Sequence, residues 1–236
     1  MLNVLKMFGY GEQIDTSNSS YDTNQSISFG GNTEVIDNSG DTATRHDLIV
    51  EPAYLSDSYS LSTDTFQSFS FQAGPYSWLD EVLTHSDAQT TVWSNPFGNS
   101  FSESWDKSVT QLDEFAGPGI FEESLNTRTV GGSDYFSIND GHVNADSASH
   151  IRQSTFNETV VGGVEWDSTH SASTALFSQY IAGAGGSESI WGSNTSAFDS
   201  SHISASGFEE SSTSLVTASE THQILTGTFL GAGGKG

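Results

Sequence analysis

Three oxygen-bearing side chains lie close together in the segment Asn-Asp-Gly-His-Val-Asn-Ala-Asp at residues 139–146, namely Asp140, Asn144 and Asp146. Calcium binds about six to eight oxygen atoms in proteins, often from Asp and Asn at alternate positions of a loop. Gly141 permits the sharp turn that such a loop needs. The EF-hand spacing is not met, so a solvated loop without a metal is the competing interpretation. These three residues are the predicted metal site, and calcium is the only cofactor that the sequence indicates.

A second group of candidate residues is the pair Glu165 and Asp167, which flank Trp166. On a strand, residues two apart point to the same face, so both carboxylates would lie next to an aromatic ring. Glycoside hydrolases use two carboxylates in this way. The chain contains 30 acidic residues, however, and neighbouring pairs are expected by chance in such a composition. We therefore predict no catalytic residue from this pair.

Four histidines recur at a fixed offset of 52, His150 with His202 and His170 with His222, each after a Ser or Thr. Equivalent histidines could form a metal site, but the chain has no cysteine and no H-x-H or HExxH spacing. The competing interpretation is that His with a hydroxyl residue caps a turn in a duplicated unit. We expect His150 and His202 to occupy matching positions and to bond a neighbouring carbonyl group rather than a metal. The motifs G-x-S-x-G and GxxxxGK[ST] are also absent, and the sequence predicts a protein that is not an enzyme.

The charge of the chain limits its partners. Its 236 residues include 30 Asp and Glu but only 6 Lys and Arg, which gives a formal net charge of −24. This charge would repel nucleic acid and anionic lipid surfaces, so we expect neither as a partner. No apolar run approaches the roughly 20 residues of a membrane helix, and we expect no membrane insertion. The opening segment MLNVLKMFGY is too short for the apolar part of a Sec signal peptide.

The residue types indicate the fold class. Cysteine is absent, which excludes disulfides, and 11% of the residues are aromatic, which argues for a folded chain. Abundant Ser, Thr and Gly favour strands and turns. In the segment Phe-Gln-Ser-Phe-Ser-Phe, Phe69 and Phe71 share one face and Phe66 points to the other. We predict an all-β fold of short antiparallel strands, in a duplicated β-sandwich or a solenoid-like stack, with helices only at residues 1–8 and 77–85.

An internal repeat underlies this predicted duplication. Residues 149–177 and 201–229 are identical at 11 of 29 positions at the offset of 52. Repeated units usually stack, so that each covers an apolar face which its neighbour leaves bare. We therefore expect Phe156 and Phe208 to be equivalent core residues. The same equivalence is expected for Phe177 and Phe229.

The sequence thus predicts two regions and a function class. Residues 1–125 form an N-terminal β-rich region with a degraded form of the repeat, and residues 126–236 form the duplicated β-region. The predicted function is that of a structural or assembly protein of a particle, fibre or extracellular surface layer, which associates with itself or with other structural proteins. We expect it outside the cell or on a virion, without a Sec signal peptide. The alternative is a secreted carbohydrate-binding or carbohydrate-active β-domain, stabilised by calcium.

Overall fold

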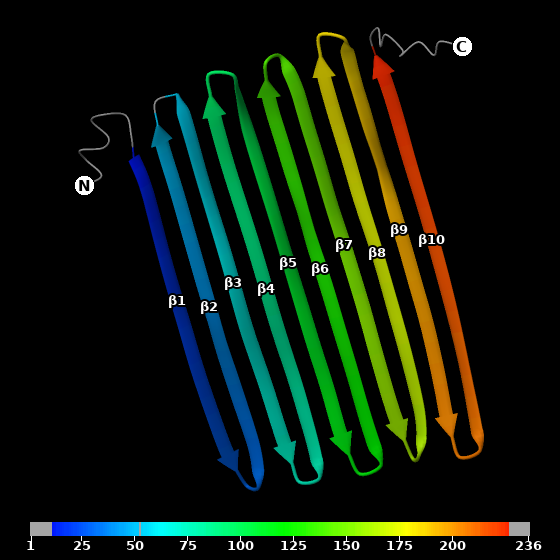
Figure 1. Ribbon diagram of the computed structural model, residues 1–236. Coiled ribbons are helices and arrows are strands. Elements are labelled where there is room, and N and C mark those ends of the chain that lie inside the picture. Colours follow the sequence, from blue (N-terminus) through cyan, green and yellow to red (C-terminus); the bar gives the residue numbers. More distant parts are fainter. Residues whose placement is uncertain (1–10, 52, 227–236) are drawn as a thin grey trace, which may run out of the picture.

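The computed structural model describes residues 11–51 and 53–226, which form ten antiparallel strands in one open sheet (Figure 1). The strands are β1 (Gly11–Phe29), β2 (Asn32–Glu51), β3 (Tyr54–Ala73), β4 (Tyr76–Asn95), β5 (Gly98–Gly117), β6 (Ile120–Asn139), β7 (His142–Val161), β8 (Val164–Gly183), β9 (Gly186–Ala205) and β10 (Phe208–Thr226). They follow one another across the sheet in sequence order. The described residues contain no helix that is long and apolar enough to span a membrane.

The predicted all-β class is confirmed, whereas the finer architecture differs from the prediction. The described residues form a single layer instead of a sandwich or a stack, and the strands are 19 or 20 residues long rather than short. The reason is the spacing of the turns. Two residues connect each strand to the next, and the turns recur at one constant interval, so each strand runs uninterrupted between two turns.

Glycine provides the backbone conformation of several of these tight turns. The φ angles are 60° and 83° at Gly30 and Gly31, and 61° and 83° at Gly162 and Gly163. Two-residue hairpins need such left-handed conformations because their twist then matches that of the flanking strands. Neighbouring turns are also joined to each other, since the amide of Gly162 donates to the carbonyl of Gly119 at 3.0 Å.

One register extends through the whole sheet. Asp41 pairs with Asp64, Asp64 pairs with His85, and His85 pairs with Ser108, and the ladders contain no bulge. We call such a line of paired residues, one from each strand, a row. Paired residues in a ladder point to the same side of the sheet, so each row belongs to one face and adjacent rows belong to opposite faces.

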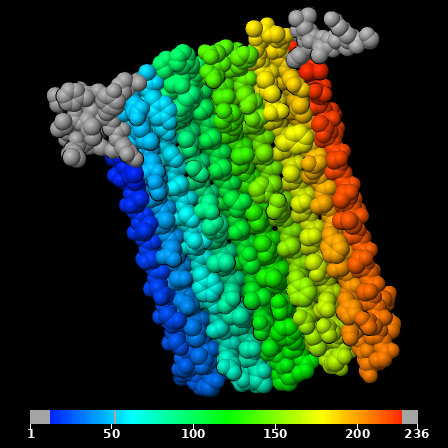
Figure 2. All heavy atoms as spheres, viewed as in Figure 1, coloured from blue at the N-terminus to red at the C-terminus, as the bar shows by residue number. Residues whose placement is uncertain are grey.

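The sheet has no hydrophobic core of its own. None of the apolar side chains of the described residues is buried, and Figure 2 shows the strands side by side as one broad face. Domains normally bury the apolar side of a sheet against a second layer. The predicted core positions are therefore wrong: Phe208 is 54% exposed.

The segments of the predicted repeat also differ in structure. The first contains the turn at Gly162–Gly163, well after its start at Ser149, whereas the second contains the turn before Phe208, much nearer its start at Ser201. The repeat offset of 52 residues is not a multiple of the constant interval between turns. A shift by this offset therefore cannot superpose one turn on another. Phe229 lies outside the described residues, and the predicted boundary near residue 125 falls within β6.

The helix predicted over residues 77–85 is wrong, because this segment belongs to β4. Its backbone pairs with β3 on one side and with β5 on the other, as in Leu79 with Ser70 and with Glu114. Ladder bonds on both sides outweigh the helical preference of a short segment, since local propensity is a weak determinant. The helix predicted over residues 1–8 lies outside the described residues.

Candidate functional site

The two faces of the sheet differ in composition. The aromatic face carries most of the aromatic side chains of the strands, and one of its rows contains Phe71, Trp78, Phe115 and Trp166. The same row also contains the acids Glu34, Glu122 and Glu210. The acidic face carries more of the carboxylates, and the adjacent row contains Glu114, Glu123, Glu158 and Asp167. Any layer that covers one face therefore meets a different chemistry from a layer on the other.

Aromatic side chains form two bands on the aromatic face, one near each end of the strands. The first band consists of Phe29, Phe69, Phe71, Tyr76, Trp78, Phe115, Trp166 and Phe208. The second consists of Tyr59, Phe101, Phe136, Tyr180 and Trp191. These rings are open to solvent, with exposed fractions of 54% for Trp78 and 41% for Trp166. Exposed apolar patches of this extent mark interaction surfaces.

A groove of about 660 Å³ lies in the second band, next to Phe136, Tyr180 and Trp191. It is hollow because small side chains stand between the rings, among them Ala145 and Ser178. Beside it, the indole of Trp191 stacks on the imidazole of a residue of β10, His222, with ring centroids 5.3 Å apart. The groove thus presents flat rings next to hydroxyl groups.

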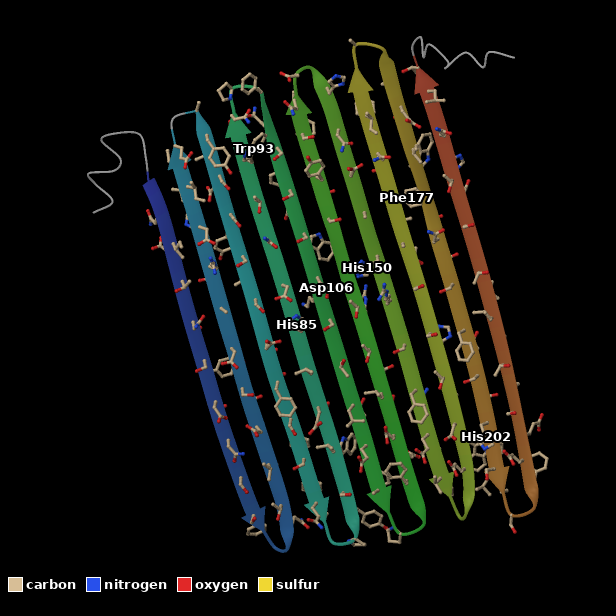
Figure 3. All side chains as sticks on the ribbon, in the orientation of Figure 1. His85, Trp93, Asp106, His150, Phe177 and His202 are labelled. Carbon is tan, nitrogen blue, oxygen red and sulfur yellow. The ribbon has the colours of Figure 1, made fainter. Side chains whose placement is uncertain are left out.

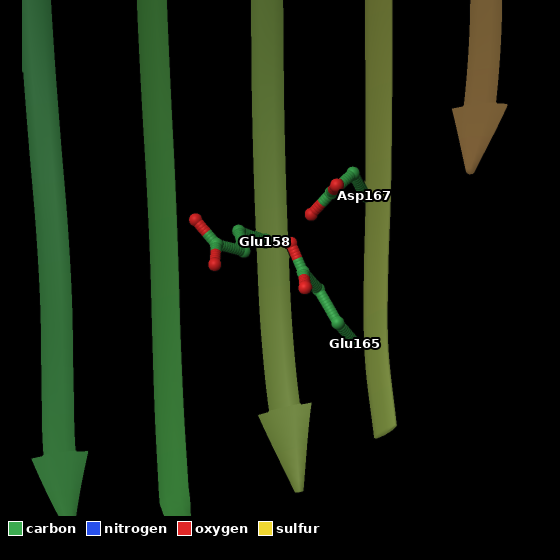
Figure 4. Close-up of side chains that lie close together, drawn as sticks. All are labelled: Glu158, Glu165 and Asp167. Carbon is green, nitrogen blue, oxygen red and sulfur yellow. The ribbon is translucent and has the colours of Figure 1, made fainter. Parts of the chain in front are cut away.

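Carboxylates crowd together on the acidic face. Figure 4 shows the side chains of Glu165 and Asp167 of β8 extending toward Glu158 of β7, and one carboxylate oxygen from each of the three residues lies within 4.8 Å of the other two. Partial burial, followed by the charges of Asp167, Glu165 and Glu123, raises the pKa of Glu158. Such a group could hold a cation, which would relieve the repulsion. The predicted shared face of Glu165 and Asp167 is confirmed, but their partner Glu158 could be found only from the strand register.

The residues of the predicted calcium site lie in two places. Asn144 and Asp146 share one face of β7, and Asn144 Nδ2 donates to Asp146 Oδ2 at 3.2 Å. Asp140 instead occupies the β6–β7 turn with a left-handed φ of 46°, and its amide donates to the carbonyl of Phe97 at 3.0 Å. Within the described strands and turns, no hydrogen bond joins Asp140 to the other two side chains. The calcium site remains a prediction.

A groove of about 870 Å³ crosses the middle of the acidic face, where small residues of several strands lie in adjacent rows. His85 bridges two carboxylates beside it, with 2.5 Å from Nδ1 to Asp64 and 2.6 Å from Nε2 to Asp87. These hydrogen bonds raise the pKa of His85. Hydrogen bonds from Ser62 and then His85 lower the pKa of Asp87.

A glycine allows a second histidine–carboxylate contact in this groove. His150 Nε2 lies 3.4 Å from Asp106 Oδ2, although β6 runs between their strands (Figure 3). The residue of β6 in the same row is Gly131, and a Cβ atom there would stand 2.6 Å from His150 and 2.8 Å from Asp106. The side chain of His150 therefore reaches across β6 only because position 131 has no side chain.

The four repeated histidines do not occupy equivalent environments. His150 contacts Asp106, His170 bonds Asp199, and His222 bonds Glu220. His202 pairs in register with Asp167 on the acidic face. His150 thus contacts a carboxylate rather than the expected carbonyl group. Carboxylates are abundant in this chain, and they come within reach of the rings from other strands, as Asp106 and Asp199 do, or from the same strand, as Glu220 does.

No protein-family model matches the chain, and no curated protein matches it. The chain is similar to the ferric yersiniabactin uptake receptor FyuA from Yersinia pestis, with 10% identity and a TM-score of 0.43, over 92% of this chain and 43% of that one. It is also similar to the ferric citrate transporter FecA, with 8% identity and a TM-score of 0.25, over 93% of this chain and 42% of that one. The chain thus spans less than half the length of either protein. Similarity at this level supports no family and no function.

The raised pKa of His85 predicts a pH-dependent stability. A histidine with a raised folded pKa stabilises the fold below its unfolded pKa, 6.5, and loses this contribution as the pH rises through the folded value. The urea midpoint should therefore fall between about pH 6 and about pH 8, and it should fall less in His85→Gln. His142→Gln is the control, since His142 has no carboxylate contact among the described residues, and it should keep the wild-type dependence. Equal pH profiles for His85→Gln and wild type would contradict the prediction.

The raised pKa of Glu158 predicts that its charge destabilises the sheet. Removal of the charge in Glu158→Gln should raise the urea midpoint at about pH 7, and the gain should shrink at high salt and at low pH. Added calcium should raise the wild-type midpoint more than that of the variant. The matched control is Glu34→Gln, because Glu34 lies opposite Ile27 and Phe71 rather than another acid. A midpoint that falls in Glu158→Gln would show that the charge is stabilising.

Proposed function

We propose that this protein is a non-enzymatic structural protein, which assembles with copies of itself outside the cell or on a virion into a particle, fibre or surface layer. The observation that carries the proposal is the single-layer sheet whose aromatic face has no cover among the described residues. A sheet with one apolar side is stable only when that side packs against another layer. The second layer in this proposal is the aromatic face of a second copy.

The size of the face supports a stable contact. Ten strands about 4.8 Å apart, each rising about 3.3 Å per residue over 20 residues, span about 3,000 Å². Stable interfaces bury about 800 Å² on each partner, and obligate ones bury more. Even partial overlap of two sheets would therefore exceed the area that a lasting complex needs.

The position of the bands favours stacking of identical sheets. One band lies near each end of the strands, so two sheets packed in opposite strand directions still place rings over rings. The rows between the bands carry few aromatic rings, among them Trp105, and include small polar side chains such as Thr63 and Ser86. Stacked sheets lie about 10 Å apart, a distance that two layers of aromatic side chains fill.

The net charge of −24 opposes this association, and cations should relieve it. Salt screens carboxylates over a Debye length of about 8 Å at physiological ionic strength, and calcium can bridge them directly. We therefore include calcium in the proposal as an ion that neutralises the acidic side chains. Assembly should increase with salt and with calcium, as followed by sedimentation velocity.

Substitutions in one aromatic row test the stacking directly. The triple variant Trp78→Ser, Phe115→Ser, Trp166→Ser should associate more weakly, with a dissociation constant at least about tenfold higher than that of the wild type. The reason is that three large rings no longer become buried in the contact. The control is Trp93→Ser, Phe121→Ser, Phe156→Ser, which removes three rings from the acidic face. Sedimentation velocity and negative-stain microscopy provide the readout, with circular dichroism to verify strand content. A wild-type chain that stays monomeric at every concentration, salt and calcium level would overturn the proposal.

The groove beside Phe136, Tyr180 and Trp191 favours carbohydrate binding as a second candidate function. Its flat, exposed rings next to serine hydroxyls could stack on sugar rings and bond their hydroxyl groups. Trp191→Ala and Tyr180→Ala should then abolish binding to a polysaccharide column or glycan array, whereas Trp93→Ala, on the other face, should not. Binding that survives both groove substitutions, or a silent array with the wild-type protein, would remove this candidate.

A further inference from the structure

The two edge strands of the sheet leave their outer backbone groups unpaired and have few features that block pairing. β1 and β10 are the outer strands, each is 19 residues long, and no strand of the described residues pairs with their outer sides. Neither strand contains Pro, Lys or Arg, and neither ladder contains a bulge. Natural proteins usually block edge strands with these features, because free backbone N–H and C=O groups recruit further strands. Both edges thus lack proline, lysine, arginine and bulges, and the side chains that carry a formal charge there are acids.

The directions of the two edge strands allow them to meet. Ten antiparallel strands alternate in direction, so β1 and β10 run oppositely, as Figure 1 shows. When a second copy is shifted sideways without rotation, its β1 lies antiparallel to β10 of the first. This is the relation that every neighbouring pair already has within the sheet. The shift also keeps the aromatic face of both copies on the same side.

The common register of the sheet fixes which residues would face each other. Extended by one strand, the row of Phe208 and Ala205 reaches Phe29 of the next copy. The row of Val216 reaches its Tyr21, and the row of His222 reaches its Asp15. Cross-strand pairs of this kind, aromatic with aromatic and His with Asp, stabilise sheets.

Charge is also compatible in this register. The acids of β10 are Glu209, Glu210 and Glu220, and their rows reach Ser28, Ile27 and Ser17 of the next copy, so none faces an acid. Several of the remaining pairs have Ser, Thr or Asn on both strands. Hydroxyl pairs already join strands inside the sheet, as between Ser201 and Ser212 at 2.9 Å. In a chain of net charge −24, two edges without an acid pair are the surfaces least opposed by repulsion.

We propose that β10 of one copy pairs antiparallel with β1 of the next copy, in the register that the sheet already uses. The partner is a second copy of this chain, and the contact is head-to-tail. Such a contact does not close on itself and generates an open ribbon or filament. This inference rests on the proposed assembly function and adds to it the contact along which the assembly grows.

New carboxylates on β10 test the pairing and its register. Leu215→Asp with His222→Asp would place acids opposite Asp22 and Asp15 of the next copy. Two like-charge pairs in place of neutral or favourable ones should raise the critical concentration for ribbon growth by about tenfold. Addition of Asp15→Asn and Asp22→Asn to this variant should restore growth. The readouts are light scattering and ribbon length in negative-stain micrographs.

The matched control is Ser212→Asp with Ser219→Asp, which adds two acids to the same strand opposite Gln25 and Asn18. It should grow more readily than the Leu215→Asp, His222→Asp variant. Equal growth of the two variants, or no rescue by the changes in β1, would overturn the proposed register. Wild-type dimers of fixed size would overturn edge pairing and leave face stacking intact, whereas single-layer ribbons would support edge pairing and contradict face stacking.

Discussion

The regular spacing of two-residue turns is the constraint on which the rest of the structure depends. The interval from one turn to the next is constant along the chain, so every strand begins level with the next and the same register continues from β1 to β10. Because this interval is an even number, the alternation of side chains stays in phase from strand to strand. A single inserted residue would exchange the two faces in every later strand. The aromatic bands, the row of carboxylates and the histidine contacts all follow from this phase.

Since the sheet is one layer, its stability comes from the backbone ladders and from side chains within each face rather than from a core. The short contacts of His85 with Asp64 and Asp87 and the reach of His150 over Gly131 are examples on the acidic face. Such exposed pairs contribute little individually. The large apolar area of the aromatic face therefore provides the main driving force still available, and it acts only when another layer covers it.

The fold class and the alternation of side chains between the two faces could be predicted from the sequence. The arrangement of the strands in a single layer could not. Composition indicated the all-β class, and alternation placed Phe69 and Phe71 on one face with Phe66 on the other, as their register confirms. The signal that determines the layer is the constant interval between glycines of successive turns, at Gly119, Gly141, Gly163, Gly185 and Gly207. Matches between Ser-rich segments at a different offset obscure this period. The partner of Glu165 and Asp167 was out of reach, because Glu158 joins them only through pairing of β7 with β8.

The larger number of carboxylates on the acidic face also limits how the proposed assembly can grow. When two sheets stack through their aromatic faces, both acidic faces point outward. A third layer would then have to bring rows such as Glu114, Glu123, Glu158 and Asp167 against a further sheet, and like-charge repulsion opposes this. In the edge strands this row ends in Ser26 and Ser211, which carry no charge. The repulsion that opposes a third layer therefore does not oppose extension by strand pairing. In the proposed assembly, a two-layer ribbon thus covers the rings, pairs the backbone edges and leaves the carboxylates of the acidic face in contact with water.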